Sequence, residues 1–122
     1  MATRLNLVVI RVADLERSAS FYRSMQMPLT KESHGAGPDH YSVDLGGVVM
    51  ELYPRRSEAE ATTQTRIGLV VEKLDDVLAV CQASGGQLIA AAKDSPWGRR
   101  AIVKDPDGHT IELVESLKNP AG

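Results

Sequence analysis

Two glutamates occupy equivalent positions of an internal repeat. The segment Gly47–Leu52 recurs in related form 61 positions later as Gly108–Leu113, and the copies carry Glu51 and Glu112. A positioned carboxylate can act as a general base. Two carboxylates together can also bind a hard cation such as Mg²⁺ or Mn²⁺. This pair is therefore the first candidate for chemistry in the chain.

The histidines and the cysteine offer weaker candidates. His34 lies in a glycine-rich segment, residues 33–39, and is expected to be solvated. His40 begins a predicted strand and can reach the edge of a binding site, whereas His109 is expected in a turn or on the surface. None of the three has a partner at metal-ligand spacing on a predicted helix or strand. Cys81 falls on the apolar face of a predicted helix, which indicates an inert buried thiol. No nucleophile-elbow motif frames a serine, so a catalytic triad is not predicted.

Aromatic and basic residues could contact a ligand. Trp97, the single tryptophan, either packs at the entry to a strand or forms, with Tyr53, an aromatic wall for a planar ligand. Arg99 and Arg100 are consecutive on a predicted strand, where successive side chains point to opposite faces. We expect one of them to reach a binding cleft and to favour an anionic ligand.

The repeat also organises the elements that position these residues. Each half reads as a strand, a helix and three further strands. Asp14 is a good N-cap for a first helix that ends at Pro28, and a second helix is predicted from about Lys73 to Ser84. Alternating apolar residues and turn signals predict the following strands: Leu5–Val12, Leu29–Glu32, His40–Leu45, Val48–Tyr53, Gln87–Ala91, Arg99–Lys104 and His109–Glu115.

Strand alternation predicts which residues accompany the two glutamates. If Glu51 faces a cleft, then Val49 and Tyr53 do so too, while Met50 and Leu52 pack against a helix. By the same rule, Ile111 and Leu113 pack into the core if Glu112 faces the cleft.

Length and charge narrow the function classes. The chain has 122 residues, enough for one domain, and a formal net charge of −2. This charge gives no electrostatic basis for nucleic-acid or membrane binding, and no segment has the apolar length of a membrane span. One cysteine allows no internal disulfide, which fits the cytoplasmic location that we expect.

Two segments resemble the vicinal-oxygen-chelate superfamily, which includes glyoxalases, bleomycin-resistance proteins and extradiol dioxygenases. They are Val12–Ser18 with Phe21–Tyr22, and Trp97–Arg100 leading into Asp105–Leu113. The resemblance implies an α+β fold in which two βαβββ modules form a curled mixed sheet around a cleft, with helices outside. It implies a single domain over residues 1–122, with module one at about 4–54, a linker at about 55–65 and module two at about 66–116. It also implies a homodimer.

The same resemblance implies a metal site at four positions, here Leu7, Glu51, Arg66 and Glu112. Leucine has no donor atom and arginine cannot be deprotonated to bind a metal, so a transition metal is not expected. Three interpretations stay open: an ion network in which Arg66 bridges one or both glutamates, the same charges orienting a polar ligand, or a carboxylate-only Mg²⁺ or Mn²⁺ site.

The function expected is therefore that of a metal-free and cofactor-free small-molecule binding protein, similar to drug-sequestering bleomycin-resistance proteins. The expected cleft is lined by Leu7, Glu51, Tyr53, Arg66, Trp97 and Glu112. One alternative is a glyoxalase-like lyase, isomerase or dioxygenase with an atypical metal or a glutamate as general base. A second alternative is a non-catalytic regulatory module whose cleft is obstructed.

Overall fold

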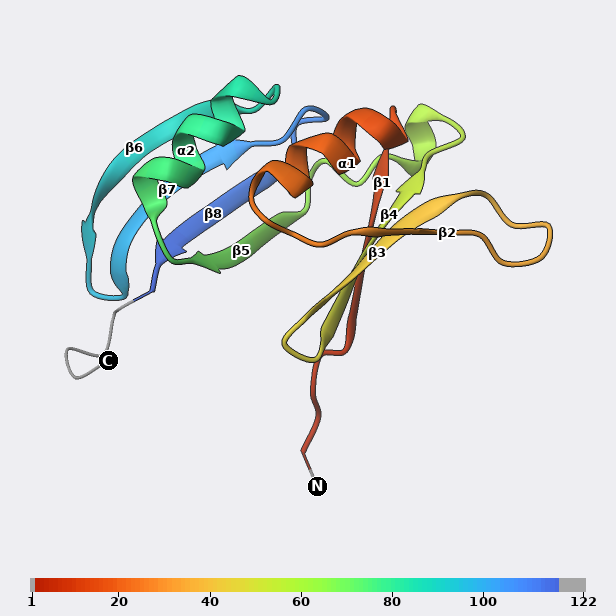
Figure 1. Ribbon diagram of the computed structural model, residues 1–122, viewed down its shortest axis with the longest axis horizontal. Coiled ribbons are helices and arrows are strands. Elements are labelled where there is room, and N and C mark those ends of the chain that lie inside the picture. Colours follow the sequence, from red (N-terminus) through yellow and green to blue (C-terminus); the bar gives the residue numbers. More distant parts are fainter. Residues whose placement is uncertain (1, 117–122) are drawn as a thin grey trace. The chain divides into compact units, whose positions relative to one another are not determined.

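The computed structural model describes residues 2–116. These residues form two compact units that meet in the sequence between Thr62 and Thr63, each built from one α-helix and one four-stranded sheet (Figure 1). This arrangement confirms the predicted α+β class. Within the described residues, neither helix is long and apolar enough to cross a membrane.

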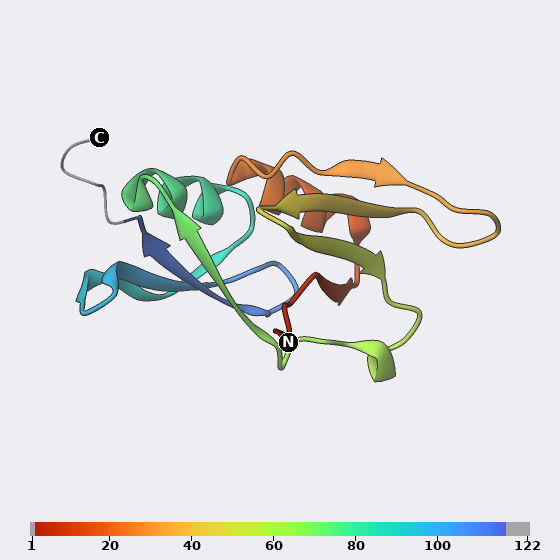
Figure 2. The same ribbon diagram turned by 90° about the horizontal axis from the view of Figure 1, so that it is seen from below.

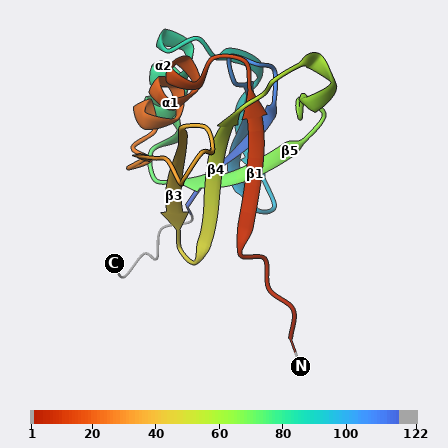
Figure 3. The ribbon, with the colours of Figure 1, turned by 90° about the vertical axis from the view of Figure 1, so that its right-hand side faces the viewer.

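Unit 1 has the strand order β1-β4-β3-β2 (Figure 3). The outer strand β1 runs parallel to β4, whereas β3 is antiparallel to both β4 and β2. The elements of this unit are β1 (Leu7–Val12), α1 (Leu15–Ser24), β2 (Thr30–Glu32), β3 (His40–Leu45), β4 (Val48–Pro54) and the short 3₁₀ helix η1 (Glu58–Glu60).

Unit 2 repeats this topology, with the strand order β5-β8-β7-β6 (Figure 2). Its parallel pair is β5 with β8, and its antiparallel pairs are β6 with β7 and β7 with β8. The elements are β5 (Arg66–Val71), α2 (Leu74–Ala83), β6 (Gln87–Ser95), β7 (Gly98–Lys104) and β8 (Thr110–Glu115). The match between the two strand orders confirms the internal repeat inferred from the sequence.

Each unit buries the helix-facing side of its sheet. In unit 1, Met50 and Leu52 of β4 are buried, while the intervening Glu51 is only partly covered. In unit 2, Ile111 and Leu113 are buried on either side of Glu112. Period-2 alternation therefore works as predicted, and it leaves both glutamates on the sheet face opposite the apolar core.

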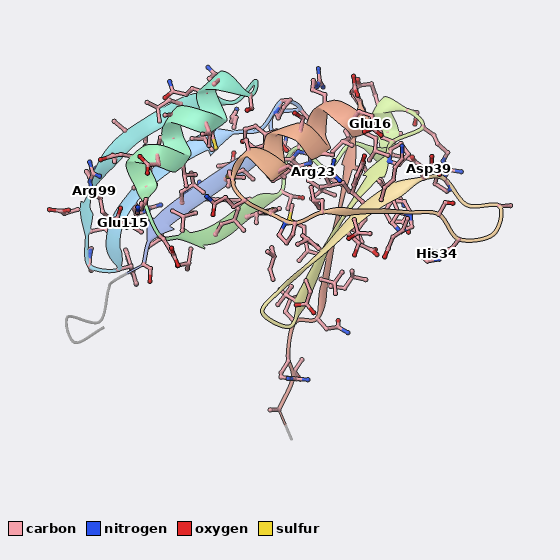
Figure 4. The ribbon with its side chains drawn as sticks, viewed as in Figure 1. Glu16, Arg23, His34, Asp39, Arg99 and Glu115 are labelled. Atoms are coloured by element: carbon pink, nitrogen blue, oxygen red, sulfur yellow. The ribbon has the colours of Figure 1, made fainter. Side chains whose placement is uncertain are left out.

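The two helices begin in different ways. Asp14 caps α1 as predicted, because its carboxylate accepts a hydrogen bond from the Arg17 backbone N–H at 3.0 Å. Lys73 gives α2 no side-chain cap. Instead, Glu115 at the end of β8 accepts a hydrogen bond from the Leu74 backbone N–H at 2.9 Å (Figure 4). A carboxylate distant in sequence thus compensates for the missing local cap.

Several predicted boundaries differ from the structure. Helix α1 ends at Ser24, before Pro28, because Gln26 adopts a left-handed backbone with φ of 67°. Strand β6 continues to Ser95 and contains register irregularities against β7, whereas β2 has only three residues. The predicted early start of the first strand is wrong, since β1 begins at Leu7.

Candidate functional site

Three of the expected site residues belong to unit 1 and share one face of its sheet. The parallel register pairs Leu7 with Val49, Val9 with Glu51 and Arg11 with Tyr53, so the side chains of these pairs project to the same side. Leu7 is 47% exposed and presents an apolar surface. Unit 1 therefore presents Glu51 on a sheet face that carries apolar and aromatic residues together with further polar ones, among them Arg11 and His40.

Tyr53 forms the centre of a stacked group on this face. The His40 ring lies 4.3 Å from the Tyr53 ring, centroid to centroid, and is nearly parallel to it. The Arg11 guanidinium carbon lies 5.1 Å from the Tyr53 centroid, within the range of a cation–π contact. The tyrosine is thus held by neighbours from β1 and β3, which orients its ring.

Arg66 and Glu112 belong to unit 2, where they form an ion pair. The Arg66 Nε donates a hydrogen bond to Glu112 Oε2, and the Arg100 Nη2 donates another to Glu112 Oε1. These two hydrogen bonds, first that from Arg66 and then that from Arg100, hold the pKa of Glu112 below its ordinary value. The expected bridge from Arg66 to Glu112 is present, and Arg100 completes a triad that the sequence did not predict.

Arg99 and Arg100 project to opposite faces of β7, as alternation predicts. Arg100 reaches Glu112, whereas Arg99 pairs with Asp75 of α2 at 2.8 Å on the helix side (Figure 4). Trp97 lies in the turn between β6 and β7 and is 70% exposed. Its interpretation as a packing residue is therefore wrong, and its aromatic surface is accessible. That the residues of the two units line one pocket stays a prediction.

His109 corrects another expectation. It is fully buried, and its Nδ1 lies 2.8 Å from Asp105 Oδ2. The other Asp105 oxygen accepts the backbone N–H groups of Asp107, Gly108 and His109 at 2.9–3.0 Å. Aspartate commonly binds backbone groups shortly after itself in a turn, so the signal was available in the sequence. The prediction of a surface position for His109 is wrong, because this hydrogen-bonded turn draws the ring inward.

The remaining histidines form a group in unit 1 that sequence reasoning missed. Glu32 and His40 are direct partners in the β2–β3 register, and His34 lies in the loop between them. The ligand atoms of these three residues all lie within 4.8 Å of one another. The expectation that no histidine has a partner at metal-ligand spacing is therefore wrong. Pairing of β2 with β3 across residues 33–39 brings the group together, whereas the sequence identified this segment only as glycine-rich.

Comparison with known proteins identifies the family. Residues 4–113 match the family described as the Glyoxalase/Bleomycin resistance protein/Dioxygenase superfamily. The chain belongs to this superfamily. It is 30% identical, over 98% of its length and 95% of the relative's length, to a probable lactoylglutathione lyase of Vibrio parahaemolyticus.

Solved structures agree with this assignment. An antibiotic binding protein, TnmS3 from Streptomyces sp. CB03234, superposes with a TM-score of 0.71 and 25% identity, covering 93% of this chain and 96% of that one. A hypothetical protein from S. aureus superposes with a TM-score of 0.75 and 20% identity, covering 95% of this chain and 99% of that one, which supports the fold alone.

The four positions at which the superfamily resemblance implies a metal do not fit one here. Leu7 supplies no donor atom, and Arg66 supplies a permanent cation. Both carboxylate oxygens of Glu112 already accept hydrogen bonds from guanidinium groups. A divalent ion at Glu112 would have to displace these bonds and approach two positive charges. Glu51 is the one remaining donor, and a single carboxylate is a poor metal site.

Proposed function

We propose that this protein binds a small polar organic molecule, without a metal at the four family positions. The observation that carries the proposal is the triad in which Arg66 and Arg100 each hydrogen-bond one oxygen of Glu112. This triad includes Arg66 and Glu112, the two unit 2 positions at which the family resemblance implies metal ligands, and it places fixed charges there. Sequestering a ligand requires affinity but no reaction, so the loss of the metal ligands is compatible with this function.

The charges and aromatic surfaces support an anionic, partly aromatic ligand. The triad carries one net positive charge, and the Arg66 side chain is about half exposed. A guanidinium with free N–H groups recognises carboxylate, sulfonate or phosphate oxygens. The exposed Trp97 of the same unit supplies a flat apolar surface. Similarity to an antibiotic binding protein is compatible with binding of a small organic molecule.

A binding assay with a matched variant pair tests the proposal. The reporter is 1-anilinonaphthalene-8-sulfonate, an aromatic anion, displaced by a panel of anionic aromatic antibiotics in the presence of EDTA. Trp97 fluorescence provides a second signal, because the chain has one tryptophan. R100Q should weaken binding about tenfold, equivalent to about 1.4 kcal/mol. R99Q removes the same charge from the opposite face of β7 and should leave affinity unchanged. Equal affinities of R100Q and R99Q would refute the proposal.

A lyase is the second candidate function, because Glu51 and Glu112 are both present and named lactoylglutathione lyases are 30% identical. Formation or cleavage of lactoylglutathione, measured with and without added Ni²⁺ or Zn²⁺, tests it. Turnover that requires metal and is lost in E112Q would favour the lyase over the binding protein. The homodimer stays a prediction, which light scattering of the purified protein tests.

A further inference from the structure

His40 presents a buried nitrogen that has no hydrogen-bond partner. The side chain is almost completely buried at the start of β3, where it stacks on Tyr53. Its Nδ1 lies 3.3 Å from the Pro38 carbonyl oxygen. Because a carbonyl can only accept a hydrogen bond, this contact places the proton on Nδ1. The Nε2 atom then carries a lone pair, and it is unpartnered within the part of the chain that the structure describes.

Two carboxylates face this lone pair. Glu32 Oε1 lies 3.4 Å from His40 Nε2, and Glu51 Oε2 lies 4.0 Å from it. A lone pair and two carboxylates repel one another unless a cation lies between them. A proton on Nε2 would draw a carboxylate to about 2.7–2.9 Å, the length of a charge-assisted hydrogen bond. The observed separations are longer than this and leave room for a larger cation.

His34 adds a second imidazole to the same group. Its Nε2 lies 3.7 Å from Glu32 Oε1, and its ring centroid lies 5.2 Å from that of His40. In a tetrahedral zinc site, metal–ligand bonds of about 2.0–2.2 Å place the ligand atoms about 3.3–3.6 Å apart. The Glu32 oxygen therefore stands close to coordination spacing from both nitrogens. The exposed His34 can close the remaining gap by rotating its side chain (Figure 4).

We propose that Glu32, His34 and His40 bind one divalent transition-metal ion at the β2–β3 hairpin of unit 1. Two imidazoles and a carboxylate favour Zn²⁺, Ni²⁺ or Co²⁺ over Mg²⁺, which prefers oxygen ligands. Glu51 is a candidate for the fourth ligand. The Pro38 carbonyl and the Tyr53 ring act on His40 as outer supports, since they fix its tautomer and its orientation.

This site differs from the four family positions, of which it shares only Glu51. Its ligands come from the hairpin of a single unit, so the inference does not depend on how the two units assemble. It also does not depend on the proposed ligand-binding function, which is measured in the presence of EDTA. Failure of one proposal therefore leaves the other untouched.

Metal titration of the whole chain tests the site. Protein purified without a nickel column and treated with chelator is dialysed against Zn²⁺ or Co²⁺. The expected result is one ion per chain, with the visible absorption of four-coordinate Co²⁺. E32Q and H34Q should each weaken the affinity at least about tenfold, because loss of an outer support alone already costs 10–100-fold. D39N removes a charge from the same hairpin outside the ligand set and should keep the parent affinity.

The same measurements can overturn the proposal. Absence of stoichiometric binding would refute it, as would E32Q and H34Q affinities equal to that of D39N. Loss of the ion in E112Q with retention in H34Q would place the metal at the family position instead. Because Glu32 and His34 are not buried, both variants are expected to fold, which their melting temperatures check. Long-range ¹H–¹⁵N spectra provide a direct readout, since Zn²⁺ should shift the His40 Nε2 resonance while Nδ1 stays protonated.

Discussion

Replacing Arg100 with glutamine should destabilise the fold more than replacing Arg66, although both arginines pair with Glu112. The difference follows from solvent exposure. The Arg66 side chain is 52% exposed, whereas Arg100 is 26% exposed and lies on the central strand β7. Water and salt screen the Arg66 pair more strongly than the Arg100 pair.

The magnitudes follow from measured ion pairs. An exposed pair contributes about 0.2–1 kcal/mol, which sets the expected coupling between Arg66 and Glu112. A hydrogen bond to a charged group contributes about 1.5–3 kcal/mol when it is shielded. Partial exposure of Arg100 and Glu112 reduces this value, so we expect a coupling of about 1–2 kcal/mol for that pair.

Double-mutant cycles with R66Q, R100Q and E112Q measure both couplings by urea unfolding at pH 7. The pKa of Glu112 is lowered in the folded state, so the pair contributes its full stability above the unfolded carboxyl pKa. This contribution is lost as the pH falls through the lowered folded value. A coupling for Arg66 equal to or larger than that for Arg100, or couplings that persist in acid, would contradict the reasoning.

Three further predictions concern other parts of the fold. Burial raises the pKa of Cys81 to about 11, so an aromatic disulfide at pH 8 should label it at least about a hundredfold more slowly in the native protein than in urea; equal rates would contradict this. D105A removes the side-chain acceptor of three backbone N–H groups in the β7–β8 turn, of which that of Gly108 keeps the Asp105 carbonyl, and it removes the partner of the buried His109 ring. It should cost about 3–5 kcal/mol in urea unfolding, and a loss below about 1 kcal/mol would show that this turn is dispensable. E115Q removes the charge at the start of α2 and should cost about 0.3–1 kcal/mol, with most of the effect absent in high salt.

Several features of this protein follow from local sequence patterns. Alternation along one strand placed Glu51 opposite Met50 and Leu52, and it sent Arg99 and Arg100 to different faces. The N-cap function of Asp14 depends on residues within one helical turn. The repeat predicted that both units share one succession of elements along the chain, a strand, a helix and three further strands. Each of these properties follows from residue types and their spacing along the chain, so the sequence alone is sufficient to predict it.

Tertiary pairing decided the rest. Glu32 meets His40 because the β2–β3 register pairs them, and that register depends on the geometry of the turn over residues 33–39, which was not predicted. Arg100 contacts Glu112 because β7 and β8 are neighbouring strands. Glu115 of β8 accepts the Leu74 N–H of α2, although the two residues are far apart in sequence. These contacts depend on which segments become neighbours in space. The free energy that selects this arrangement comes from burial of the whole apolar core, and no short segment of the sequence specifies it alone.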